Sequence, residues 1–397
     1  MSSKKTTDYV YDSIQLLANP VAVFDQIRED GDVVWCPALR RWLVLSKPAA
    51  IKALSNPDLV VYDLFNAFRK IEEKSKKNLQ NILRICDWIP FLHDGARHNQ
   101  LRLLFAKVLT ELQDDYLYTF ERVSSTLLEQ MLCKGKGDFA VDYSDRLHIE
   151  TLGRLAEFSE EDSLWIAENS SSQGSVDFAA SLGEILDANH RATVLLDRIE
   201  MLIKKHHDSK LIKMIHRQLV SAGIEDNLIN RTGFMTALML LGRDTLSGTL
   251  TVGLAHLFGQ NQGELKPENW SDESWWLNEY IRLSSTVQIV NRVATKEVFL
   301  AGQRISKGDM LMVFPPAANR DPSSFSCPHS ISDTNSNNIA FGTGRHLCTG
   351  KVLSRKSINI VLKHLSMLQN IKAMQGQKID DSKNTRKYKN LPITLQR

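Results

Sequence analysis

Residues 341–350 read Phe-Gly-Thr-Gly-Arg-His-Leu-Cys-Thr-Gly, a glycine-rich turn directly before a strongly helical stretch. Gly342 and Gly344 allow positive φ angles and the close approach of backbone amides in this turn. The following helix offers free N–H groups and the positive end of its dipole, and both favour an anionic sulfur at Cys348. The stretch is therefore suited to present a single thiolate to a metal.

A thiolate with no second cysteine beside it suits the axial position of haem iron. The pattern Phe-Gly-x-Gly-x-His-x-Cys-x-Gly over residues 341–350 matches the cysteine loop of the cytochrome P450 family position for position, so the chain resembles that family. The resemblance implies that Cys348 is the axial ligand of haem b. It also implies that Phe341, Gly342 and Gly350 shape the loop that binds the cofactor.

The chain has 397 residues, which exceeds the usual size of a single hydrophobic core. No Pro/Gly/Ser-rich linker divides it, so we expect a single oxygenase domain over residues 1–397. This domain should be mainly α with a minor β region at about 32–60 and 286–314 and a strand near the C-terminus. The formal net charge of +3, with scattered basic residues, argues against nucleic acid as a partner.

Neither a membrane anchor nor a disulfide framework is expected. The first eight residues contain no apolar run, and no stretch reaches the roughly 18 apolar residues of a membrane span. The five cysteines are widely spaced and odd in number, which is typical of a reducing compartment. The cysteines thus predict a cytoplasmic protein, and within the family the expected lack of an anchor resembles the soluble bacterial type.

Apolar periodicity and turn residues predict the order of the elements. We expect a hairpin over 32–46, a short helix over 47–54, and mostly helical structure from 96 to 205. A long helix should cover 229–258 and another 272–284. Strands are predicted at 286–294, 297–300, 310–314 and 393–395, and a last long helix at 350–368.

In the family fold a long central helix lies over the haem and the cysteine loop lies beneath it, and residues 229–258 resemble that helix. They contain Gly242-Arg243-Asp244-Thr245, which is similar to the family's Gly-x-Asp-Thr oxygen-activation motif. The resemblance implies that Thr245 orients oxygen and water and that Asp244 belongs to the proton path.

Local chemistry in this segment supports the same interpretation. A buried acid is costly unless it is satisfied. A threonine can bond back to the carbonyl four residues earlier, here that of Leu241, and bend the helix locally. Gly242 should leave space where a ligand must approach, whereas the bulk of Leu241 should narrow the pocket.

Four side chains resemble the family's ligands of the haem propionates. His98 and Arg102 lie four residues apart on one helical face, Arg292 is a cation in an apolar strand, and His346 precedes the cysteine by two residues. A guanidinium suits a carboxylate because its planar fork donates two parallel hydrogen bonds.

Glu279-x-x-Arg282 resembles the family's structural Glu-x-x-Arg pair, which holds the segment beneath the haem. The chain departs from the family pattern at the third member of that network. Between Arg320 and Arg345 there is no arginine. His329 or Asn335 is the expected substitute, unless this segment is held in another way.

The resemblance implies separate electron-transfer partners, because the chain contains no glycine fingerprint for flavin or nicotinamide. We expect electrons from NAD(P)H through a ferredoxin or flavodoxin with its reductase, or direct use of peroxide. A basic surface could speed encounter with an acidic partner. Its candidate residues are Arg97, Lys107, Arg345, Lys351, Arg355 and Lys356.

The resemblance implies a haem-thiolate oxidoreductase that activates dioxygen to oxidise a small apolar organic substrate in secondary metabolism. The substrate would arrive free or bound to a carrier protein, and a flat aromatic one would fit a narrow apolar pocket. The predicted pocket residues are Trp88, Ile89, Phe91, Leu238, Leu241, Val287 and Ile289.

Several interpretations stay open from the sequence. Hydroxylation by rebound and oxidative coupling of phenols or heteroaryls are both compatible with the motifs. A non-catalytic haem sensor is an alternative that the Asp244-Thr245 pair disfavours. A zinc site at His346 and Cys348 would need two further ligands, which the spacing does not supply.

Overall fold

The computed structural model describes residues 20–170, 181–266, 270, 274–332, 337–380, 382 and 384–397. These residues form two compact units. The first contains those within 1–62, 248–348 and 372–391, and the second those within 63–247, 349–371 and 392–397. Helix α11 (Leu228–Gln260) continues from the second unit into the first after Ser247. A single domain over the whole chain stays a prediction.

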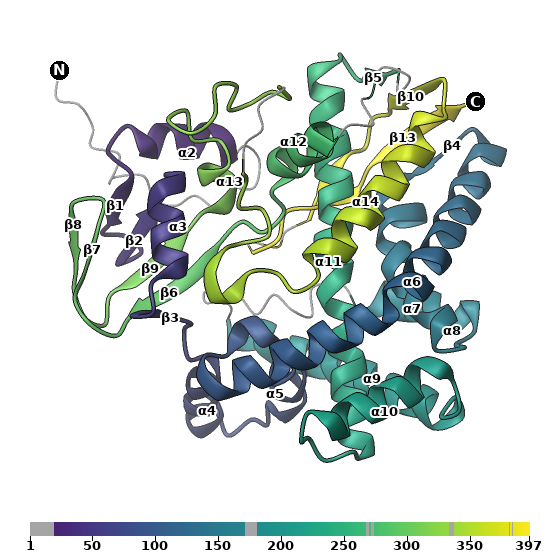
Figure 1. The fold of residues 1–397 in the computed structure, drawn as a ribbon, viewed down its shortest axis with the longest axis horizontal. Coiled ribbons are helices and arrows are strands. Elements are labelled where there is room, and N and C mark those ends of the chain that lie inside the picture. Colours follow the sequence, from purple (N-terminus) through teal and green to yellow (C-terminus); the bar gives the residue numbers. More distant parts are fainter. Residues whose placement is uncertain are drawn as a thin grey trace. The chain divides into compact units, whose positions relative to one another are not determined.

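A five-stranded sheet forms the centre of the first unit, with strand order β1-β2-β9-β6-β3 (Figure 1). The strands are β1 (Val33–Cys36), β2 (Arg41–Val44), β9 (Met310–Val313), β6 (Val290–Ala294) and β3 (Leu59–Val60). The predicted hairpin is confirmed, since β1 and β2 pair antiparallel with Trp35 opposite Trp42. β2 and β9 pair in parallel.

Both faces of this sheet are buried, because successive side chains of a strand point to opposite sides. Val33 packs into one apolar cluster together with Ala50 and Leu54 of α3 (Lys47–Ser55). Its neighbour Val34 packs into the other cluster, with Phe24 of α2 (Pro20–Arg28). The sheet therefore has a helix packed on each face.

The first unit contains further short elements. They are α12 (Ser274–Ser284), the hairpin of β7 (Val298–Leu300) and β8 (Gln303–Ile305), α13 (Pro315–Ala318), β5 (Glu264–Leu265), β11 (Lys378–Ile379) and β12 (Tyr388–Asn390). The strand expected over 286–294 starts only at Val290. Before it, the backbone turns at Ser285, which has a φ of 23°, and Gln288 N–H bonds to the carbonyl of Asn384.

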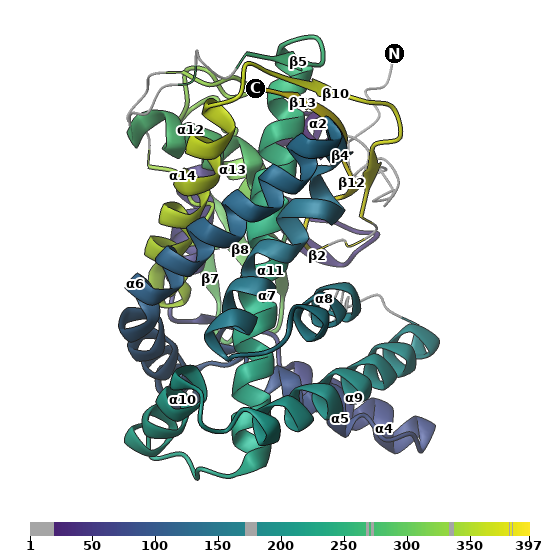
Figure 2. The same cartoon turned by 90° about the vertical axis from the view of Figure 1, so that its right-hand side faces the viewer.

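The second unit is built on the 40-residue helix α6 (Gly95–Lys134), against which α7 (Asp145–Leu155) and α14 (Lys351–Ser366) pack (Figure 2). The predicted apolar face of α6 is confirmed, since its residues are almost completely buried: Leu101, Leu104, Val108 and Leu112. Gly135 ends the helix in the left-handed conformation. The expected C-terminal strand is β13 (Pro392–Gln396), which pairs with β4 (Lys136–Asp138).

Five more helices complete the second unit: α4 (Leu64–Ser75), α5 (Gln80–Cys86), α8 (Glu160–Asn169), α9 (Leu182–Lys205) and α10 (Lys210–Ser221). α5 packs against α9. Strand β10 (Asn370–Ala373) follows α14 in the chain. Among the described residues, no helix combines the length and the apolar character that crossing a membrane requires.

Candidate functional site

The cysteine loop in the first unit has the backbone that its glycines predict. Gly342 and Gly344 have φ angles of 70° and 69°, which favour glycine. The amide of Cys348 donates to the carbonyl of Phe341 at 2.9 Å, so the loop closes on itself. The thiol of Cys348 is exposed, and α14 begins three residues later at Lys351.

The loop is held against α3 and β3. A Cβ atom at position 344 would lie 2.8 Å from the carbonyl oxygen of Leu54, so only glycine fits there without a shift. Arg345 donates to the carbonyl of Leu59 at 2.9 Å and to that of Pro57 at 3.4 Å. Its guanidinium therefore anchors the loop, in addition to any role in the predicted basic surface.

Glu279 and Arg282 of α12 form a completely buried ion pair. Two parallel hydrogen bonds of 2.8 and 2.7 Å join the guanidinium to the carboxylate. The other bonds of the guanidinium reach main-chain carbonyl oxygens at 2.8–3.0 Å, those of Asn319, Cys327, Pro328 and Ser330. The pair thus ties α12 to the segment that leads towards the cysteine loop.

The segment between Arg320 and Arg345 reaches Glu279 through its backbone among the described residues, because the amide of Ser332 is 3.4 Å from Glu279 Oε2. Of the two expected substitutes for the missing arginine, His329 lies 3.3 Å from the carboxylate of Asp25, and Asn335 is outside the described residues. Arg320 is itself buried and donates to the carbonyl of Leu283.

Thr245 and Asp244 lie on α11, in the part that belongs to the second unit. Thr245 Oγ1 donates to the carbonyl of Leu241 at 3.2 Å, so the predicted back-bond is present. The carboxylate of Asp244 is 2.6 Å from Nη1 of Arg243 and is partly exposed. The acid that the motif places in the helix is therefore satisfied by its own neighbour.

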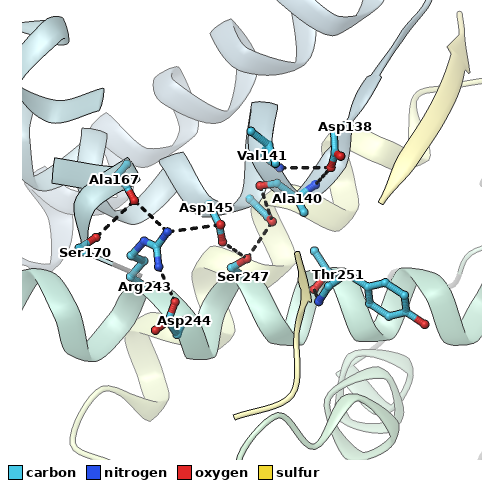
Figure 3. Close-up of polar contacts among 12 residues, drawn as sticks. Asp138, Ala140, Val141, Asp145, Ala167, Ser170, Arg243, Asp244, Ser247 and Thr251 are labelled. Atoms are coloured by element: carbon cyan, nitrogen blue, oxygen red, sulfur yellow. Dashed lines mark hydrogen bonds and ion pairs between the residues drawn. The ribbon is translucent and has the colours of Figure 1, made fainter. Parts of the chain in front are cut away.

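Arg243 is the centre of a polar network that α11 forms with α7 and α8 (Figure 3). Its guanidinium is 3% exposed, donates to the carbonyl of Ala167 at 2.8 Å and lies 3.3 Å from Asp145 Oδ2. Ser247 Oγ donates to the other oxygen of Asp145 at 2.5 Å. A buried charge needs such partners. Sequence reasoning missed Asp145, although a charged residue within an apolar helix signals that a buried counter-charge exists.

The space beside Gly242 is filled by a protein side chain. A Cβ atom at this position would lie 2.5 Å from Cε1 of His148, a residue of α7. The expectation that Gly242 leaves room for an approaching ligand is therefore corrected: in this structure the glycine makes room for the imidazole. Nothing in the sequence pattern pointed to His148, because a lone histidine on a helix has no spacing signal.

The predicted propionate ligands divide between the units. In the second unit, His98 is buried on α6, and Arg102 Nη1 lies 3.3 Å from the hydroxyl of Thr349. In the first unit, Arg292 is buried in β6 and donates to the carbonyl of Asn291 at 2.8 Å, and His346 lies in the cysteine loop. Arg102 is thus next to the residue that follows the cysteine.

The predicted pocket residues have different environments. In the second unit Trp88 and Ile89 are buried, Trp88 meets Phe234 edge-on with ring centroids 5.8 Å apart, and Phe91 is exposed. Leu238 is buried on α11, and Leu241 is partly buried. In the first unit Val287 forms an isolated bridge with Thr385, and Ile289 packs against the cluster around Phe24.

The chemistry of these residues fits haem with a thiolate ligand. An exposed thiol in a fixed turn before a helix can reach a metal, and arginine and histidine side chains can donate to propionate carboxylates. Among the described residues, no three His, Cys, Asp or Glu side chains gather as a metal site would require.

Comparisons with known proteins agree with this geometry. The family model of cytochrome P450 matches residues 274–394, which contain α12, β6 and the cysteine loop. The putative cytochrome P450 140 of Mycobacterium bovis is 35% identical over 133 residues, 32% of this chain, and this chain covers 30% of that protein. The biotin biosynthesis cytochrome P450 of Bacillus subtilis is 25% identical over 89% of this chain and 90% of that protein.

A solved structure is similar over almost the whole chain. P450BioI in complex with hexadec-9Z-enoic acid ligated acyl carrier protein has a TM-score of 0.81 at 22% identity, over 96% of this chain and 100% of that chain. The fold is therefore that of the cytochromes P450, mainly helical with small sheets. Residues 274–394 thus match the cytochrome P450 family model, and the chain is similar to members of that family over most of its length.

Proposed function

We propose that this protein is a haem-thiolate monooxygenase that uses dioxygen to hydroxylate a small apolar organic molecule. The observation that carries the proposal is the exposed thiol of Cys348, fixed in a turn with two positive-φ glycines. Cys348 would be the axial ligand of haem b. The cofactor supplies the oxidising chemistry when bound, and a thiolate ligand favours cleavage of the O–O bond.

The remaining residues of the cofactor site would bind and orient it. His98, Arg102, Arg292 and His346 would donate to the propionates, and Phe341, Gly342 and Gly350 would shape the loop at the cysteine. Glu279 and Arg282 would act from a distance, because their buried pair holds the backbone between α12 and the loop. These roles rest on the family motif and on the donor chemistry of each side chain.

Thr245 and Asp244 would manage protons in the reaction. The hydroxyl of Thr245 can accept a bond from water while it donates to the carbonyl of Leu241. The carboxylate of Asp244 is partly exposed and held by Arg243, so it can accept hydrogen bonds from water at a fixed position. The pair would place a proton donor at a fixed position on α11.

Electrons would come from NAD(P)H through a ferredoxin or flavodoxin and its reductase, and the reaction would take place in the cytoplasm. The substrate is proposed to be apolar and to belong to secondary metabolism, and Trp88, Ile89, Phe91, Leu238, Leu241, Val287 and Ile289 are the proposed pocket residues. A carrier-bound substrate is supported by the likeness to P450BioI, which was solved with an acylated carrier protein.

The test is a spectral titration followed by turnover with isotopically labelled dioxygen. The purified haem protein is titrated with free fatty acids, aromatic compounds and an acyl carrier protein that bears a long acyl chain. A shift from low to high spin identifies the substrate class, and one labelled oxygen atom in the product shows monooxygenation. A coupled product without labelled oxygen would show that the reaction is oxidative coupling and not hydroxylation.

A further inference from the structure

The imidazole of His148 connects two helices of the second unit, α6 and α11, and α11 is the helix that carries Asp244 and Thr245. His148 lies on α7 and is 7% exposed. Its Nδ1 is 2.7 Å from the hydroxyl of Tyr116 on α6, and its Nε2 is 3.0 Å from the carbonyl oxygen of Leu238 on α11. Both ring nitrogens are therefore engaged by partners on different helices.

The partners determine which nitrogen carries the proton. A carbonyl oxygen can only accept, so Nε2 must donate to Leu238, and in a neutral ring Nδ1 then accepts from Tyr116. Burial lowers the pKa of His148 to about 4, with the charge of Arg243 as a smaller cause, so the neutral ring is the stable form near neutral pH. Donation runs in one direction, from Tyr116 through His148 to Leu238.

This bond acts on the helical backbone one turn before the oxygen-activation motif. In a regular α-helix the carbonyl of Leu238 accepts from the amide of Gly242. A side-chain donor at the same carbonyl shares that acceptor, which is a recognised cause of local bending. The ring also needs Gly242, because a Cβ atom there would lie 2.5 Å from Cε1.

The same helix α7 holds α11 on the other side of the motif. Asp145, three residues before His148, accepts from Ser247 and pairs with Arg243, which in turn holds Asp244. Contacts from α7 thus flank the turn that carries Asp244 and Thr245. A small change in the ring at position 148 would change where these two side chains lie.

We propose that His148 is a positioning residue: its neutral Nε2–H ring fixes the turn of α11 between Leu238 and Gly242, and thereby the placement of Asp244 and Thr245. This inference rests on the function proposed above for Thr245. It predicts a defined tautomer and a specific loss of coupling, which a merely space-filling histidine would not show.

The tautomer is measured by nitrogen-15 NMR of the histidine-labelled holoenzyme, with the His148→Gln variant to assign the signal. We expect a neutral Nε2–H ring at pH 6 and still at pH 5, about one unit above its pKa. A protonated ring at pH 6, or an Nδ1–H tautomer, would overturn the proposal. This arm needs no turnover, so it tests the hydrogen bonds of His148 even if the proposed reaction is wrong.

The functional arm compares His148→Phe, which keeps a ring and removes both bonds, with His364→Phe. His364 on α14 is half-buried and its Nδ1 is 2.7 Å from Ser124 Oγ, so the control loses a similar bond away from α11. With surrogate redox partners, His148→Phe should release at least about threefold more hydrogen peroxide per NADPH than the control.

Equal peroxide release by the two folded variants would overturn the positioning role. If His148→Phe fails to fold, the pair Gly242→Ala and Gly259→Ala replaces it. The methyl added at position 242 would lie 2.5 Å from Cε1 of His148, so it should displace the ring and raise peroxide release, whereas a methyl at position 259 meets nothing within 4 Å and should not. Equal peroxide release by these two variants would contradict the positioning role. Failure of the proposed function would instead appear in the unmodified protein, as absence of oxygen-dependent NADPH consumption.

Discussion

At the scale of single residues, Arg282 is a side chain that makes several buried hydrogen bonds at once. Its guanidinium makes a bidentate pair with Glu279 and also reaches four main-chain carbonyls. We predict that Arg282→Gln lowers the free energy of unfolding by about 3–5 kcal/mol, because it leaves Glu279 as an uncompensated buried charge. Thermal unfolding of the haem-loaded protein measures the effect.

Arg304→Gln is the matched control, since Arg304 pairs with Glu297 on the surface of the same unit. Its side chain is 70% exposed, and an exposed pair contributes about 0–1 kcal/mol. Similar losses in the two variants would contradict a structural role for the buried pair.

The role of the Thr245 hydroxyl can be tested with two variants, one that removes the hydroxyl and one that keeps it. We predict that Thr245→Ala lowers the fraction of NADPH that yields product by roughly tenfold, as the loss of a positioned proton-transfer group would. Thr245→Ser retains a hydroxyl that can bond to the carbonyl of Leu241 and should lose far less. The product and the peroxide per NADPH are measured together. Equal coupling in the alanine variant and the unmodified protein would remove Thr245 from proton delivery.

At the scale of elements, the glycines of α11 differ in what packs against them. A glycine within a helix costs about 0.5–1 kcal/mol relative to alanine. Gly233→Ala should nevertheless destabilise, because its Cβ would lie 2.2 Å from Nε1 of the buried Trp88. Gly259→Ala on the same helix meets nothing within 4 Å and should stabilise by about 0.5–1 kcal/mol. Thermal midpoints of the two variants should move in opposite directions, and a shift of the same sign would contradict this packing.

The elements also show which features the sequence could predict. The bounds of α11 and α14 differ from the predicted 229–258 and 350–368 by two residues or fewer at each end, because apolar periodicity and glycines mark them. β6 begins at Val290, later than the predicted 286, because Val287 and Gln288 pair with Thr385 and Asn384 instead of continuing the strand. Long-range partners of this kind leave no local pattern.

The candidate site likewise contains residues that the sequence could predict and residues that it could not. The residues of the cysteine loop, Thr245 and the Glu279–Arg282 pair are found from short motifs, because a fixed spacing along the chain sets their geometry. Asp145 and His148 could not be found in this way. They act on α11 from another helix, and only the fold brings α7 against Leu238, Gly242 and Arg243.

At the scale of the whole molecule, the buried His148 and the partly buried His256 predict how stability depends on pH. His148 and His256 both have a pKa of about 4 in the fold against an ordinary value of 6.5, and burial is the main cause in each. Between these pH values the unfolded chain binds more protons. The contribution of the two neutral rings to the free energy of unfolding is therefore fully present above pH 6.5 and decreases as the pH falls towards 4. Below pH 4 these two groups cause no further change.

We expect this effect to reach up to about 3 kcal/mol for each ring, at 1.36 kcal/mol per unit of pKa difference. Unfolding midpoints of the unmodified protein between pH 7 and pH 4 measure it, and His148→Phe should show a shallower decline. His207→Phe is the control for the loss of an exposed imidazole. An identical slope in His148→Phe would contradict the buried neutral ring.

The most direct test of the account is the absorption spectrum of the reduced, carbon monoxide-bound protein, compared among the unmodified chain, Cys348→Ser and Cys327→Ser. Cys327 is also exposed and lies in the same unit, so it controls for the loss of a surface thiol. The account predicts the long-wavelength Soret band of thiolate-ligated haem in the unmodified protein and in Cys327→Ser, and its loss in Cys348→Ser. Retention of that band in Cys348→Ser would contradict the assignment of Cys348 as the haem ligand.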